Sequence, residues 1–74
     1  MEAVETRELA RLLSDWLRAL PREDRVLFLR RYWYGATVKE LAVEARCTEN
    51  QMAQRMRKLR QALRAVLEQE GIAI

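Results

Sequence analysis

Histidine is absent from the 74-residue chain, cysteine and proline occur once each, and glycine occurs twice. Without histidine the chain lacks the commonest general acid–base residue and one of the usual zinc ligands. The single cysteine permits no disulfide within the chain, which favours a reducing, cytoplasmic setting. No apolar run approaches the roughly 20 residues that cross a bilayer, so the sequence predicts no membrane segment.

The polar residues that remain give little support to catalysis. No glycine-rich phosphate loop is present, and Ser14 falls within an amphipathic helical pattern. The carboxylates stand where helix starts and surface ion pairs use them. We therefore expect a protein that is not an enzyme and that holds no metal or cofactor. Cys47, near a predicted helix start, has two interpretations. It is either a redox-sensing thiol or a residue that fills the apolar corner of a turn, and the second interpretation is favoured.

The composition is that of a helical, globular protein. Hydrophobic residues make up 50% of the chain and charged residues 34%, while the helix formers Ala, Leu, Arg, Glu and Gln dominate. The length allows one domain, residues 1–74, with one modest core.

Two helices are predicted in the first half of the chain. Leucines and Trp16 recur at steps of three and four residues, which predicts a helix from about Val4 to Ala19. Pro21 ends this pattern and suits the first turn of a second helix, which we expect to end at Gly35 in a left-handed cap. On that helix Val26, Leu29 and Trp33 share the predicted inner face, and Phe28 and Tyr32 widen it. The aromatic residues are interpreted as packing residues; they are Trp16, Phe28, Tyr32 and Trp33.

Two helix starts lie close together in the stretch "TVKELAVEARCTENQMAQRM". Thr37 is followed three residues later by Glu40, and Thr48 three residues later by Gln51, so each threonine begins a capping box. A third helix therefore begins at Thr37, and a fourth begins at Thr48 and runs toward Gly71. The expected inward residues of these two helices are Leu41, Ala42, Ala45, Met52, Met56, Leu59, Leu63 and Val66 or Leu67.

The spacing of the two boxes predicts a helix-turn-helix over residues of about 37–60. The third helix has room for about two turns before the chain must turn at Arg46–Thr48. Ala42 allows the following helix to approach closely, and Met52 faces it. The fold class is therefore all-α: a small four-helix domain with a C-terminal helix-turn-helix and a long recognition helix.

Charge is concentrated on the fourth helix. Between Arg46 and Arg64 there are six basic residues and one acid, a local charge of +5, and the net charge of +3 leaves −2 for the remainder. A basic segment on an otherwise slightly acidic domain indicates a polyanionic partner, although a solvated helix face would have the same composition.

A helix-turn-helix places the first turns of its second helix in the major groove of duplex DNA. Asn and Gln pair with adenine edges and Arg with guanine, while the helix start and basic side chains bind phosphates. We expect phosphate contacts from the basic residues Arg46, Arg55, Arg57, Lys58 and Arg60. The predicted DNA-binding residues are Arg46, Thr48, Asn50, Gln51, Ala53, Gln54, Arg57 and Lys58.

The stretch "LPREDRVLFLRRYWYGATVKELAVEARCTENQMAQRMRKLRQALRAVLEQEGI" resembles region 4 of bacterial sigma-70 family RNA polymerase sigma factors, especially the extracytoplasmic-function type. The shared features are Leu20-Pro21, "KELA", the "TENQ" helix start and "RKLRQALRAVLEQEG". The preceding "LARLLSDWLRAL" is similar to the helix before that block, so the resemblance covers nearly the whole chain.

This resemblance implies recognition of the −35 promoter element through the fourth helix. It also implies docking on the β-subunit flap of RNA polymerase through an apolar groove. The candidate residues, which have packing as their alternative role, are Leu27, Phe28, Leu63 and Leu67. The parts of a sigma factor that melt the promoter and bind the polymerase clamp have no counterpart in the sequence. We therefore expect a domain of a sigma factor or a stand-alone relative.

Two positions depart from the family pattern. Arg46 stands where the family often has Gly in the turn, and a left-handed Arg costs roughly 1 kcal/mol or more, which favours a turn built differently. Ala53 stands where a basic residue is frequent and lacks that residue's phosphate or base contact.

The alternative class is a helical protein-interaction module. In that interpretation the Trp, Phe and Leu surface pairs with a partner helix, an anti-sigma factor or a second copy, and the basic face is only a solvated surface. A stand-alone dimeric helix-turn-helix regulator of palindromic DNA lies between the two.

Overall fold

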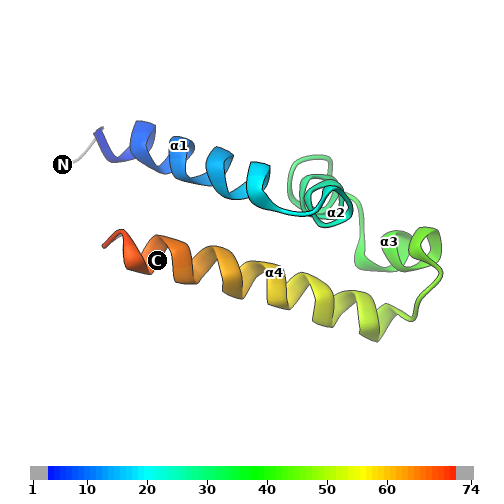
Figure 1. The fold of residues 1–74 in the computed structure, drawn as a ribbon. Helices are drawn as coiled ribbons and strands as arrows, with labels where there is room; N and C mark the ends of the chain where they lie inside the picture. The colour runs from blue at the N-terminus through cyan, green and yellow to red at the C-terminus, as the bar shows by residue number, and fades with distance from the viewer. Residues whose placement is uncertain (1–3, 72–74) are drawn as a thin grey trace.

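A computed structural model describes residues 4–71, and these residues form four α-helices. The helices are α1 (Val4–Ala19), α2 (Arg22–Tyr32), α3 (Val38–Ala45) and α4 (Glu49–Gln69). Figure 1 shows α1 and α4 lying side by side in antiparallel directions, with α2 running across them and α3 at the far end. The molecule is elongated, with extents of 43 × 20 × 19 Å. The predicted all-α class and the predicted helix order are confirmed.

The core lies where α2, α3 and α4 meet the C-terminal part of α1. Leu41, Met52 and Met56 are completely buried, and Ala42 is nearly so. Full burial of a leucine or methionine side chain contributes roughly 1.5–3 kcal/mol to folding. The predicted facing of Ala42 and Met52 is consistent with this core, because both belong to its single buried cluster.

Aromatic packing joins α1 to α2. The rings of Trp16 and Phe28 meet edge to face with centroids 5.0 Å apart, and Tyr32 packs against Phe28 at 4.8 Å. Edge-to-face pairs of this kind add about 0.5–1.5 kcal/mol to the burial of the rings. The packing interpretation of Trp16 and Phe28 is therefore confirmed, while Tyr32 remains about half exposed.

The predicted inner face of α2 is confirmed at Phe28 and wrong at Val26 and Trp33. Trp33 is 78% exposed and Val26 43% exposed, whereas Phe28 is buried and Leu27 packs against the core. The reason is that α2 carries charged residues at both ends, and its short apolar run fits two helical faces equally well. Ala45, predicted to face inward on α3, is also exposed.

Gly35 follows α2 in the left-handed conformation that the sequence predicts, with φ of 78°. The amide of Ala36 donates to the carbonyl of Arg30 over 2.9 Å, and Arg31 donates to the carbonyl of Ala36 over 3.3 Å. These bonds close the end of α2 and direct the chain to α3.

The turn between α3 and α4 contradicts the expectation for Arg46. This residue adopts the left-handed conformation, with φ of 59° and ψ of 44°, and its amide donates to the carbonyls of Ala42 and Val43. The amide of Cys47 also donates to Ala42, over 3.0 Å. These hydrogen bonds satisfy the last carbonyls of α3, so the turn keeps the geometry of a glycine-containing turn despite the strain at Arg46. Cys47 is half-buried against the core, as its packing interpretation requires.

Replacing Arg46 by Gly should stabilise the domain. Gly occupies left-handed backbone without steric strain, so we expect Arg46→Gly to be more stable than Arg46→Ala by about 1 kcal/mol. Both variants remove the same charge, so the comparison isolates the backbone. Chemical denaturation followed by circular dichroism measures the difference, and equal stabilities would contradict the strain argument.

Candidate nucleic-acid interface

Both predicted capping boxes are formed. At α3 the hydroxyl of Thr37 accepts from the Glu40 amide over 3.0 Å, and the Glu40 carboxylate accepts from the Thr37 amide over 2.8 Å. At α4 the matching distances between Thr48 and Gln51 are 3.0 and 2.9 Å. Because each box satisfies two amides of a helix start, the three residues Arg46–Thr48 are enough to end one helix and begin the next.

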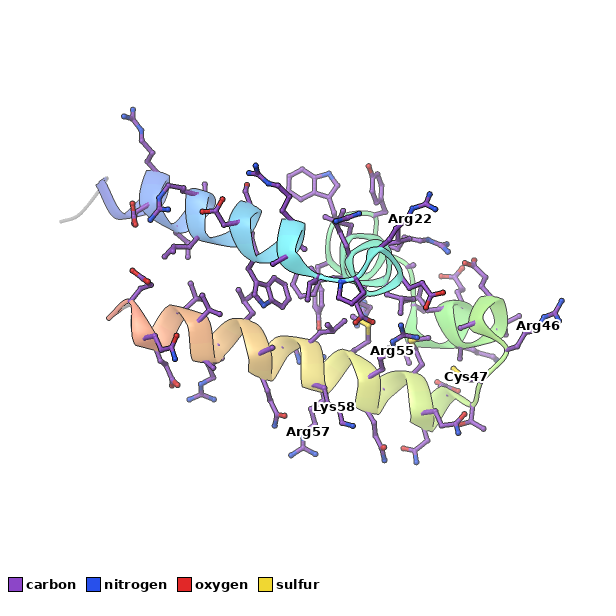
Figure 2. The ribbon with its side chains drawn as sticks, viewed as in Figure 1. Arg22, Arg46, Cys47, Arg55, Arg57 and Lys58 are labelled. Atoms are coloured by element: carbon purple, nitrogen blue, oxygen red, sulfur yellow. The ribbon has the colours of Figure 1, made fainter. Side chains whose placement is uncertain are left out.

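One face of the first three turns of α4 is buried and the opposite face is open. Met52, Met56 and Leu59 point into the core, which leaves the intervening positions on the surface. All eight predicted DNA-binding residues are exposed: Arg46, Thr48, Asn50, Gln51, Ala53, Gln54, Arg57 and Lys58. Figure 2 shows Arg57 and Lys58 on the side of α4 turned away from α2, and Arg46 at the end of the molecule beyond α3. The structure therefore brings six of the eight together along α4 from Asn50 to Lys58, and Thr48 caps the start of the same helix.

The exposed residues of α4 differ in whether their side chains already make hydrogen bonds within the protein. The side-chain oxygens of Thr48 and Gln51 already accept hydrogen bonds in the capping box, so these two residues order the helix start. Asn50, Gln54 and Arg57 are exposed without such a bond within the described part of the chain.

Two arginines that were predicted to bind phosphates form hydrogen bonds with side chains of α2 instead. Arg55 donates to Asp24 through Nε over 3.0 Å and through Nη2 over 2.7 Å. Arg60 donates to the hydroxyl of Tyr32 over 2.7 Å. The sequence gives no signal for these pairings because the partners are 31 and 28 residues apart.

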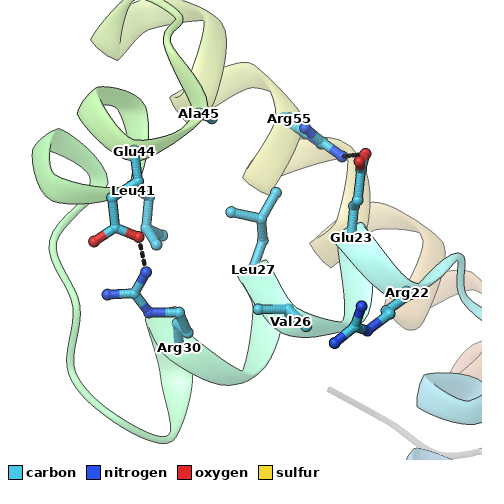
Figure 3. A pocket seen from close by; sticks show the side chains of 9 residues that line it. All are labelled: Arg22, Glu23, Val26, Leu27, Arg30, Leu41, Glu44, Ala45 and Arg55. Carbon is cyan, nitrogen blue, oxygen red and sulfur yellow. Dashed lines mark hydrogen bonds and ion pairs between the residues drawn. The ribbon is translucent and has the colours of Figure 1, made fainter.

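The four residues predicted for the flap groove do not line one groove. Leu27 lines a cleft of about 460 Å³ between α2 and α3, together with Val26 and Leu41. Leu63 and Leu67 line a separate cleft of about 430 Å³ along α4. Phe28 lies in the core between Trp16 and Tyr32. Figure 3 shows the first cleft, whose rim carries an ion pair between Arg30 and Glu44 and another between Arg55 and Glu23.

Residues 4–71 offer no cluster of three or more acidic, histidine or cysteine side chains that could hold a metal ion. Among their helices, none combines the length and the apolar character that a membrane crossing requires.

Residues 6–63 match the family model described as "Sigma-70, region 4". The chain belongs to this family. The match covers both the helix-turn-helix and the two helices that support it, so it includes all eight predicted DNA-binding residues. A search of curated proteins found no match.

Membership in the region 4 family makes this chain a DNA-binding, helix-turn-helix domain of the sigma-factor class, which acts in transcription initiation with promoter DNA and RNA polymerase. The family is one of transcription factor domains and is not catalytic. Its DNA-binding role agrees with a recognition helix whose outer face is exposed and rich in amide and basic side chains.

Sequence reasoning missed the exposed aromatic surface, which we define as Tyr32, Trp33 and Tyr34. Trp33 is 78% and Tyr34 75% exposed, although aromatic residues in a small domain usually lie in the core. The sequence carries no local signal for this exposure, because the face of α2 that is covered depends on how α1 and α4 pack against it.

The capping box at α3 makes stability depend on the ionisation of Glu40. Hydrogen bonds from the backbone and side chain of Thr37 lower the pKa of this carboxyl, and the positive charge of Arg30 adds to the effect. A lowered folded-state pKa means that the stabilisation is fully present above the unfolded pKa of about 4.3 and is lost as the pH falls through the folded value.

Glu40→Gln keeps an acceptor for the Thr37 amide, as Gln51 does in the second box, but it cannot titrate. We expect wild type to lose more stability than Glu40→Gln when the pH falls from 5 to about 3. Thermal unfolding at several pH values measures this difference. Glu8, whose pKa is lowered by Arg11, is present in both proteins and cancels. Parallel pH profiles would contradict the assignment.

Proposed function

We propose that this domain recognises the −35 element of promoter DNA with the exposed face of α4 and docks on core RNA polymerase to direct transcription initiation. The observation that carries the proposal is the division of α4 into a buried face and an open one. The methionine and leucine side chains fix the helix, and the amide and basic side chains remain available to a duplex.

The residues on the outer face of the first turns of α4 read the base edges. Asn50 and Gln54 offer amides that pair with adenine edges, and Arg57 offers the forked donor that suits guanine. Ala53, which lacks the basic side chain frequent in the family, presents a methyl group that can contact a thymine methyl.

Phosphate binding sets the register on the duplex. Arg46 projects from the turn and Lys58 from the third turn of α4, and Figure 2 shows them well separated along the molecule. The helix start at Thr48 adds a positive dipole end, which favours a phosphate oxygen. These contacts span the same surface as the base-reading residues, so one docking geometry can use both.

The cleft at Leu27 supports docking on the polymerase β-subunit flap. Its floor is apolar, formed by Val26, Leu27 and Leu41, and its rim carries charges of both signs. This cleft lies between α2 and α3, so an occupant would leave the outer face of α4 free for DNA. The extracytoplasmic-function type remains the expectation from the resemblance.

Binding of the isolated domain to promoter-like duplex should be weak and salt-sensitive. Each phosphate neutralised contributes about −0.9 to the slope of log K against log salt concentration. We expect Arg57→Ala to weaken binding and to relax base preference, because a lost bidentate contact costs about 1–3 kcal/mol of discrimination. Fluorescence anisotropy over a salt series measures both quantities.

Arg18→Ala is the matched control for Arg57→Ala. Arg18 is an exposed arginine near the end of α1, and its only close partner among the described residues is Asp15 at 3.5 Å. Its removal takes away the same charge and should leave the binding profile nearly unchanged. Equal losses in the two variants would contradict a specific role for Arg57.

The exposed aromatic surface favours a second candidate, in which two copies associate through Tyr32, Trp33 and Tyr34. Tyr and Trp are enriched at protein interfaces, and single-copy packing leaves most of Trp33 and Tyr34 uncovered. In that case the basic face of α4 would be a solvated surface.

Sedimentation and gel-shift measurements made in parallel separate the two candidates. We expect a monomer that binds duplex DNA, with Trp33→Ser leaving both properties unchanged. A stable dimer that is indifferent to DNA and that dissociates in Trp33→Ser would contradict the first candidate and support the second.

A further inference from the structure

Arg55 stands apart from the other basic residues of α4 because it points toward α2. Both its Nε and its Nη2 donate to one oxygen of Asp24, over 3.0 and 2.7 Å, and Nη2 lies 3.8 Å from Glu23. Figure 2 shows Arg55 between α4 and α2, whereas Arg57 and Lys58 lie on the opposite side of α4. The guanidinium is therefore directed into the protein and away from the proposed DNA surface.

The pairing is more protected than the other ion pairs among residues 7–71, whose side chains the structure describes. The side chain of Asp24 is only 24% exposed and that of Arg55 39%, while Glu23 is 89% exposed. Asp24 belongs to the first turn of α2, where the helix dipole favours a carboxylate. Two donors of the planar guanidinium bind the same carboxylate oxygen, which is more directional than a contact made by the ammonium group of lysine.

This contact joins the second turn of α4 to the start of α2. Met52 and Met56 hold α4 by apolar packing, which resists separation but is less directional than a hydrogen bond. The Arg55–Asp24 bonds add a directional restraint on the rotation of α4 about its axis. That rotation decides whether Asn50, Gln54 and Arg57 face the duplex.

We propose that Arg55 is a positioning residue of the recognition helix and that Asp24 keeps it from acting as a phosphate ligand. This inference rests on the proposed DNA-binding function of α4. Arg55 thereby contributes to the preference for promoter over random DNA without neutralising a phosphate. Without the Asp24 carboxylate, the long side chain of Arg55 is free to swing from the α2 side of α4 toward the DNA, which strengthens sequence-independent binding.

The salt dependence of binding tests the proposal, because its slope counts phosphate contacts. In Arg55→Gln we expect promoter affinity to fall about 5- to 10-fold, which corresponds to about 0.9–1.4 kcal/mol, because the recognition helix is less well oriented. The slope should stay unchanged, because the Arg55–Asp24 contact neutralises no phosphate. In Asp24→Ala we expect the slope to steepen by about 0.9 and binding to random duplex to strengthen. Fluorescence anisotropy with promoter-like and random duplexes provides all of these values.

Two further variants separate the release of Arg55 from a simple change of net charge. Glu23→Ala removes the same charge one residue away and should leave the slope at the wild-type value. The double variant Asp24→Ala/Arg55→Gln should also return the slope to the wild-type value, because no released arginine remains. Arg55→Lys, which keeps the charge, should restore part of the promoter preference that Arg55→Gln loses.

A slope that flattens by about 0.9 in Arg55→Gln would overturn the inference, because Arg55 would then be a phosphate ligand. A steeper slope that persists in the double variant would overturn it as well. Wild-type protein that shows no salt-sensitive binding to either duplex would overturn the proposed function, and this inference with it. Circular dichroism of each variant confirms that the helices are intact.

Discussion

The close packing of α4 on α3 is the constraint on which the rest of the domain depends. Ala42 has a side chain small enough to let α4 approach, and Met52 and Leu41 are completely buried at the same junction. If this contact were looser, the turn at Arg46–Thr48 would not fix an angle between the two helices. The exposed face of α4 is a surface of defined orientation only because its opposite face is held there.

The same junction explains why a left-handed arginine is tolerated. Three turn amides, including those of Arg46 and Cys47, find acceptors at the end of α3 or in the capping box of α4. Each such hydrogen bond contributes about 0.5–1.5 kcal/mol to folding. Together they offset the strain of roughly 1 kcal/mol at Arg46, so the hydrogen-bonding pattern of the turn prevails over the preference of the residue. The expectation of a different turn was wrong because it considered only the conformational preference of Arg46 and not the hydrogen bonds of the turn.

Local signals predicted the helices well, and long-range contacts account for what was missed. Helix starts at Thr37 and Thr48 follow from side chains three residues apart, and the break at Pro21 follows from one residue. Val26 and Trp33 were wrongly placed on the inner face of α2 because its apolar residues fit two faces, and only the positions of Trp16 and α4 decide between them. The pairing of Arg55 with Asp24 likewise depends on how α2 crosses α4. Composition alone counts Arg55 among the DNA-facing charges, whereas the fold removes it from that set.

The two tryptophans of the chain lie in opposite surroundings. Trp16 is packed edge to face on Phe28 in the core, and Trp33 stands almost free in solvent beside Tyr34. Indole emission depends on the polarity around the ring, so one fluorophore responds to loss of the native core while the other responds to whatever covers the end of α2. The domain thus contains two natural optical probes, and replacing either ring by phenylalanine would let the remaining one be read alone.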